Sequence, residues 1–95
     1  MMNDDIQISE IQIIPVKPNE GLVAFASFII DEKYYVGSVA IFTRLNSNGF
    51  RLVYPTKKLG ESNIYLFHPI TLGAGITIEE KVSQKVNEIL YGQQE

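Results

Sequence analysis

The 95-residue sequence predicts an α+β fold: an antiparallel β-meander of about five strands with a C-terminal helix packed on the sheet. Two observations predict this fold. The first two-thirds alternates short runs of β-branched and aromatic residues with Pro, Gly, Asn and Asp. The last quarter instead repeats Ile78, Val82 and Val86 at helical spacing. Because an apolar helix stripe must be covered, one sheet face is its expected partner in a single domain, residues 1–95.

The first two expected strands span residues 6–16 and 22–30. The alternation slips near Ser9-Glu10, as it does at a β-bulge. Pro15 and Pro18 cannot donate ladder hydrogen bonds, which places the end of the first strand at a sheet edge or outside the ladder. The second strand is almost entirely apolar, which predicts a central strand that is covered on both faces.

The next two expected strands, residues 34–45 and 50–54, meet at Asn48-Gly49, the strongest short hairpin signal that a sequence offers. The sequence between these two strands is compatible with a two-residue turn or with a four-residue turn. Either register places Arg44 and Arg51 on the same face, because the two registers differ by two residues. The same parity places on the opposite face Val39, Ile41, Leu45, Phe50, Leu52 and Tyr54. Two neighbouring arginines either bind an anion or extend into solvent.

The C-terminal third is expected to contain a polar loop, a short strand and a helix. The loop covers residues 55–63 and the strand residues 64–68, which Pro69 ends. Residues 72–75 are expected to be a flexible connection. Thr77 and Glu80 have the spacing of a capping box, which predicts that the helix begins there and ends at Gly92.

The charges are unevenly distributed along the chain. The formal net charge is −3, but residues 1–32 hold six acids and one Lys, and residues 61–95 hold five acids and two Lys. Residues 33–60 hold five basic residues and no acid. This central segment forms a basic zone on an acidic protein, which indicates either an anion-binding surface or a solvated hairpin face.

The residue types needed for catalysis are scarce. The chain has no cysteine and one histidine, His68, so no thiolate nucleophile and no zinc site with four protein ligands is expected. His68 follows an apolar run, where a Ser-His-Asp triad is improbable. We therefore expect a protein that is not an enzyme and has no metal or cofactor. With no apolar stretch of about 20 residues, we also expect no membrane insertion and a cytoplasmic location.

The order of these segments along the chain resembles that of a known protein family. The apolar run 22–31, the turn Pro55-Thr56-Lys57-Lys58 and the sequence His68-Pro69-Ile70 before a final helix are similar to the stage V sporulation protein G family, over roughly residues 6–91. The resemblance implies a homodimeric α+β regulator of septation, sporulation and gene expression in bacteria that binds DNA and RNA. The chain departs from the family pattern at three places. Members usually have a Pro-Asp-Gly-like turn where this chain has Leu59-Gly60-Glu61, an Arg-Asp pair where it has Ile64-Tyr65, and a basic residue ahead of the helix that is missing here.

Two function classes follow. The first is a dimeric nucleic-acid-binding regulator, and the alternative is an interaction or scaffold protein of the division machinery, whose basic zone meets a protein partner. The residues predicted to bind nucleic acid are Arg44, Arg51, Lys57, Lys58, His68, Lys81 and Lys85. Among these, Lys81 and Lys85 are the weaker contributors, because Glu79, Glu80 and Glu88 dilute their charge.

Overall fold

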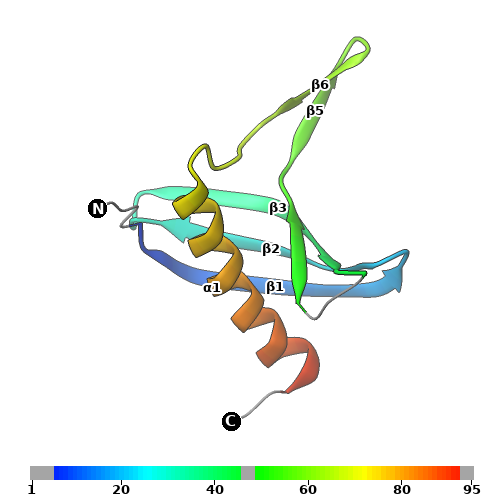
Figure 1. Ribbon diagram of the computed structural model, residues 1–95, viewed down its shortest axis with the longest axis vertical. Helices are drawn as coiled ribbons and strands as arrows, with labels where there is room; N and C mark the ends of the chain where they lie inside the picture. The colour runs from blue at the N-terminus through cyan, green and yellow to red at the C-terminus, as the bar shows by residue number, and fades with distance from the viewer. Residues whose placement is uncertain (1–5, 46–48, 93–95) are drawn as a thin grey trace.

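The computed structural model describes residues 6–45 and 49–92. Its elements are β1 (Ile8–Asn19), β2 (Leu22–Ile30), β3 (Tyr34–Thr43), β4 (Phe50–Val53), β5 (Thr56–Leu59), β6 (Ser62–Tyr65) and α1 (Leu72–Tyr91). The first four strands form one antiparallel sheet in sequence order, and β5 and β6 form a second sheet. Helix α1 lies across one face of the larger sheet (Figure 1). The predicted α+β class is confirmed, with six strands in two sheets.

Strand β1 is an edge strand, which suits its two prolines because they cannot donate ladder hydrogen bonds. The register between β1 and β2 shifts between Ser9 and Gln12, and Glu10 has a φ of 50°. The bulge predicted near Ser9-Glu10 is therefore confirmed. A second shift follows Pro15, and β1 continues to Asn19, three residues beyond the predicted end.

Strand β2 has the predicted bounds and lies between β1 and β3, so it is central. Within one chain, the prediction that both its faces are covered was wrong. Ala24, Ala26 and Phe28 are buried towards α1, whereas Phe25 on the opposite face is 38% exposed. The core consists of Val23, Ala24, Ala26, Phe28, Val36, Val39, Ile41, Phe50, Ile78, Val82 and Val86. The strand is apolar on both faces, but the one helix covers only one of them.

Strands β3 and β4 pair in a register that runs from Ala40↔Val53 to Thr43↔Phe50. The connection is therefore longer than either predicted turn, and its residues 46–48, which include Asn48 of the predicted Asn-Gly turn, lie outside the described residues. The predicted parity is preserved, because Phe50 shares a face with the core. Leu45 departs from it, since it lies beyond the end of β3 and is 94% exposed.

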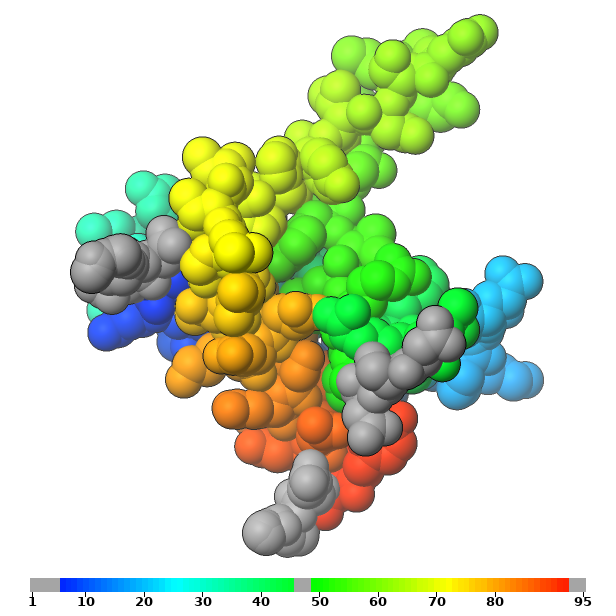
Figure 2. Space-filling model, viewed as in Figure 1, coloured from blue at the N-terminus to red at the C-terminus, as the bar shows by residue number. Residues whose placement is uncertain are grey.

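The segment predicted as a polar loop and a short strand is a β-hairpin. Strands β5 and β6 pair from Thr56↔Tyr65 to Leu59↔Ser62, and Gly60 takes the left-handed conformation in the turn, with a φ of 65°. All residues of both strands are exposed. We call residues 55–66 the arm, because they project away from the rest of the protein (Figures 1 and 2).

The N-cap of helix α1 lies six residues before the predicted cap at Thr77. Thr71 is the N-cap, and its hydroxyl oxygen accepts a hydrogen bond from the Ala74 amide at 3.2 Å. The capping box at Thr77 and the flexible connection at 72–75 were therefore wrong, because Thr71 already caps a turn that contains two glycines. The predicted end is confirmed, since Gly92 adopts the left-handed conformation that favours glycine.

We expect Thr71→Ala to lower the free energy of unfolding by about 1 kcal/mol, because one N–H at the helix start loses its partner. The matched control is Thr77→Ala, which removes the same hydroxyl within the helix. Alanine has the higher helix propensity, so this control should be neutral or slightly stabilising. Urea denaturation followed by circular dichroism measures both, and equal losses for the two variants would contradict the Thr71 cap.

Candidate nucleic-acid interface

The structure distributes the seven predicted site residues over three places. Arg44 and Arg51 line a pocket at the end of the β3–β4 hairpin. Lys57 and Lys58 lie on the arm, and His68 follows it. Lys81 and Lys85 lie on α1. The basic zone of the sequence is therefore divided between a pocket and a projecting hairpin.

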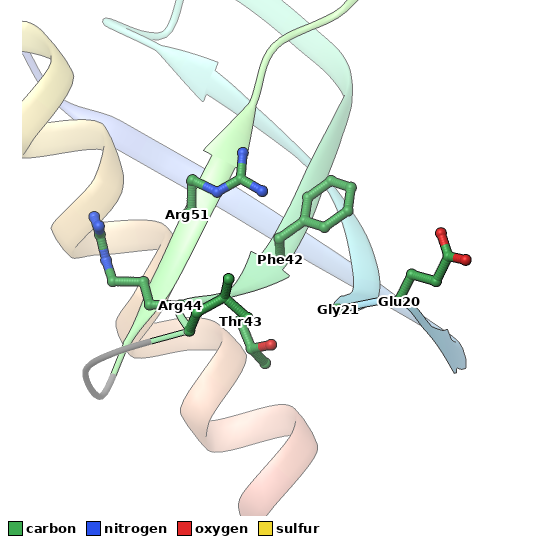
Figure 3. Close-up of a pocket in the computed structure, with 7 residues that line it drawn as sticks. Glu20, Gly21, Phe42, Thr43, Arg44 and Arg51 are labelled. Carbon is green, nitrogen blue, oxygen red and sulfur yellow. The ribbon is translucent and has the colours of Figure 1, made fainter.

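The pocket has a volume of about 410 Å³ and is lined by Glu20, Gly21, Phe42, Thr43, Arg44, Leu45 and Arg51. The Arg51 guanidinium lies over the Phe42 ring, with its central carbon 4.9 Å from the ring centroid (Figure 3). This cation–π contact follows from the register, which pairs the two residues directly across β3 and β4. The contact holds the Arg51 charge on the sheet face opposite α1.

The Arg44 side chain is directed towards the helix, away from Arg51 (Figure 3). Its guanidinium donates a hydrogen bond to the Glu79 carboxylate of α1 in an ion pair. The two side chains are 41% and 34% exposed, so solvent limits the pair to about 1 kcal/mol or less. Arg44 therefore connects the hairpin to the helix, and its charge is partly neutralised.

The arm has two different faces, because directly opposed residues of an antiparallel pair lie on the same side. One face carries Thr56, Lys58, Asn63 and Tyr65, and we call it the polar arm face. The other carries Lys57, Leu59, Ile64 and Ser62. The polar arm face thus combines a cation, an amide and an aromatic ring.

His68 lies two residues after the arm, and its ring packs against Tyr65. The two ring centroids are 4.4 Å apart, with an angle of 41° between the planes. The His68 Nδ1 lies 3.1 Å from the carbonyl oxygen of Pro69. His68 is exposed and extends the aromatic surface of Tyr65.

The helix lysines differ in their surroundings. The Lys85 ammonium lies 3.7 Å from a Glu88 carboxylate oxygen, at the i,i+3 spacing. Lys81 is exposed and has no ion pair within residues 6–45 and 49–92. Of the three acidic residues predicted to dilute their charge, Glu88 pairs with Lys85, whereas Glu79 pairs with Arg44 of the hairpin.

Asn63 was not predicted as a site residue, because residues 55–63 were expected to form a loop. The missed signal is the Gly60-Glu61 pair between two four-residue segments, which is typical of a two-residue hairpin turn. In the part of the chain that the structure describes, no group of three or more His, Cys, Asp or Glu residues could hold a metal ion. No helix among those residues has the length and apolar character to cross a membrane.

Tyr54 lies beside this region, in a second pocket that Arg51 and Glu79 also line. Burial, with a smaller contribution from the Glu79 carboxylate, raises the pKa of Tyr54 from 10.0 to about 12. A phenol whose pKa is raised by folding stabilises the folded state below its unfolded pKa. That stabilisation is lost as the pH rises through the folded pKa.

We therefore expect the free energy of unfolding to fall between pH 10 and pH 12, because the unfolded chain ionises Tyr54 first. Ultraviolet absorbance titration should show one tyrosine with a midpoint near pH 12. Tyr54→Phe should remove that step, whereas the exposed Tyr34→Phe should retain it. A titration in which Tyr54→Phe keeps the late step would contradict this assignment.

The chain matches no protein-family model, and the comparison with curated proteins gives no match. Its function therefore has to follow from the placement of its own residues. The features that bear on function are the arm, the Arg51–Phe42 pair and the exposed sheet face.

Proposed function

We propose that this protein binds nucleic acid, DNA or RNA, through the arm and Arg51, and that it does so as a homodimer and not as an enzyme. The observation that carries this proposal is the arm itself. It is a projecting two-stranded ribbon on which Lys58, Asn63 and Tyr65 share one exposed face. A cation for phosphate, an amide for base edges and a ring for stacking are the groups that such recognition uses.

The ion pairs support Arg51, Lys57 and Lys58 as the phosphate-binding residues. The two salt bridges of the described residues use Arg44 and Lys85. Their charges are thus partly committed to carboxylates within the protein. Arg51 and the two arm lysines lie outside the acidic helix and keep their charge available to an external anion.

The shape of the arm supports binding in either of two ways. The major groove of B-form DNA is about 12 Å wide and admits a two-stranded β-ribbon. Single-stranded bases instead stack on exposed rings, and Tyr65 with His68 provides such a surface. On the resemblance to the stage V sporulation protein G family, we also propose that the protein acts in the cytoplasm as a regulator of septation, sporulation and gene expression.

A scaffold function is the alternative, and the exposed apolar residues of the arm favour it. Leu59 and Ile64 are 58% and 44% exposed, which is unusual for a purely electrostatic surface. In that case the basic zone meets an acidic protein of the division machinery. Phosphate binding weakens as the salt concentration rises, whereas a hydrophobic protein interface hardly responds. The salt dependence of binding therefore separates the two functions.

The test is fluorescence anisotropy with duplex DNA, single-stranded DNA and RNA of one sequence, at 50 and 200 mM salt. Four to six phosphate contacts predict a loss of affinity of roughly 10²- to 10³-fold over this range. Absence of binding to all three ligands at 50 mM salt would refute the proposal. Binding that is unchanged by salt would exclude phosphate contacts as its source.

A further inference from the structure

The protein exposes more surface than a compact monomer of its mass. The chain exposes 6698 Å² and has a mass of 10.7 kDa, whereas a compact monomer of that mass exposes about 5,500 Å². Its radius of gyration is 13.8 Å, against about 12.4 Å for a compact domain of this length. The excess of about 1,200 Å² exceeds the roughly 800 Å² that each partner buries in a standard interface.

Part of this surface is the second face of the arm. Leu59, Ile64 and Leu66 are 58%, 44% and 62% exposed. Leu59 and Ile64 share a face by the β5–β6 register, and the Leu66 amide donates a hydrogen bond to the Pro55 carbonyl oxygen, which extends the hairpin. We call these three residues the apolar arm face. Lys57 lies on the same side, opposite Ile64, and its long side chain can cover apolar surface while its ammonium stays in water. A two-stranded hairpin with no covering layer is marginally stable in water, so this face calls for a partner.

A further part is the face of the four-stranded sheet that lies opposite α1. Ile14, Phe25, Ala40 and Val53 are directly paired across β1, β2, β3 and β4 in one continuous row. Ile14, Phe25 and Val53 are 63%, 38% and 37% exposed. We call this row the open sheet face. Each strand of the sheet contributes one apolar residue to it.

We propose that the apolar arm face of each copy of this chain packs on the open sheet face of a second copy. The arm projects away from its own sheet (Figures 1 and 2), and a second copy supplies both missing surfaces at once. Such an exchange is isologous: the two contacts are identical and close the assembly at two copies.

The charges of the arm and of β1 and β2 favour a second copy of this chain as the partner. The arm carries Lys57, Lys58 and Glu61, a net charge of +1. The described residues 6–32, which contain β1 and β2, carry four acids and one Lys, a net charge of −3, whereas those between 33 and 54, which contain β3 and β4, carry three basic residues and no acid, so the attraction is to the β1–β2 half of the face. A basic arm that approaches the acidic half of a second copy is attracted to it. Two arms or two acidic halves placed together would repel each other.

The exchange also changes the proposed nucleic-acid site, and this part rests on the proposed function. Arg51 and Lys58 lie seven residues apart in nearly extended chain, roughly 20 Å within one copy. When the apolar arm face covers the partner's sheet, the polar arm face stays exposed on the same side as the partner's Arg51. The phosphate-binding surface then combines residues of two copies.

Chemical cross-linking tests the contact directly, because the chain has no cysteine. Ile64→Cys and Ala40→Cys are purified separately, refolded together and treated with a short bis-maleimide. We expect a cross-linked species of about 21 kDa, twice the 10.7 kDa of one chain. The matched control is Ile64→Cys with Gln84→Cys, since Gln84 is exposed on α1, on the other side of the sheet. Equal yields for the two mixtures would overturn the proposal.

Sedimentation provides the second measurement. The wild type should sediment as a dimer, and Ile64→Glu on the apolar arm face should shift it to 10.7 kDa with native circular dichroism. Asn63→Glu, on the polar arm face, adds the same charge and should remain dimeric. A monomeric wild type, or a dimeric Ile64→Glu, would refute the arm exchange. Neither measurement uses nucleic acid, so the exchange and the proposed function can fail separately.

Discussion

Replacing Lys57 and Lys58 together by alanine is expected to lower the affinity for DNA or RNA by roughly 50- to 100-fold per subunit at 0.1 M salt. On duplex DNA, each phosphate that a lysine neutralises adds about 0.9 to the slope of log affinity against log salt. The slope should therefore flatten by about 1 to 2 per bound subunit. The decrease in affinity should be similar for all sequences, because phosphate contacts do not read bases.

The matched control is Lys17→Ala with Lys33→Ala, which removes the same charge from exposed positions outside the arm. This pair should change affinity far less than the arm pair. Both double variants must retain the native circular dichroism spectrum. If the two double variants lose affinity equally, net charge and not the arm determines binding. If neither changes the slope, the arm does not contact phosphate.

Replacing Phe28 by alanine is expected to lower the free energy of unfolding by about 3 to 5 kcal/mol. Phe28 is fully buried, with 0% exposure, at the centre of the single core. A chain of 95 residues has a total stability of about 5 to 14 kcal/mol. One core aromatic ring therefore accounts for a large fraction of the stability.

The control for Phe28 is Tyr34→Ala on the neighbouring strand, where the ring is 63% exposed. Truncation there leaves no cavity, so the decrease should stay near 1 kcal/mol or below. Urea denaturation of both variants gives the comparison. A Phe28→Ala effect as small as that of Tyr34→Ala would mean that this core does not supply the stability assigned to it.

The four-stranded sheet could be predicted from the sequence because its signals are local. The alternation, the prolines and the slip near Glu10 each have a direct physical meaning. The structure reproduces the bounds of β2, the edge position of β1 and the bulge. The burial of β2 was predicted less accurately, because its apolar pattern does not indicate whether one or both faces of the strand are covered.

The arm and the helix start were missed for a different reason. Lys57 and Lys58 looked like loop residues, because exposed strands lack the apolar alternation that identifies a strand over a core. At the helix, Thr77 and Glu80 have capping-box spacing, and the choice of Thr71 depends on a first turn that includes Gly73 and Gly75. Sequence spacing alone does not decide between two possible caps.

The candidate site was predicted in part. Strand parity correctly placed Arg51 on the face opposite the core, but neither predicted register paired it with Phe42. It could not place Arg44, because that residue lies just past the end of β3, where strand alternation no longer applies. There the Glu79 carboxylate, 35 residues away in the sequence, determines its direction.

The prolines and the bulge of β1 affect how the protein behaves when it is concentrated. An edge strand with unpaired backbone groups can recruit a strand from another molecule, and repeated recruitment produces fibres. Pro15 and Pro18 have no backbone N–H to donate to an added strand, and the bulge at Glu10 distorts the same edge beside a negative charge. Strand-by-strand extension from β1 is therefore unfavourable. At high concentration the protein should remain in small particles and should not elongate into fibres.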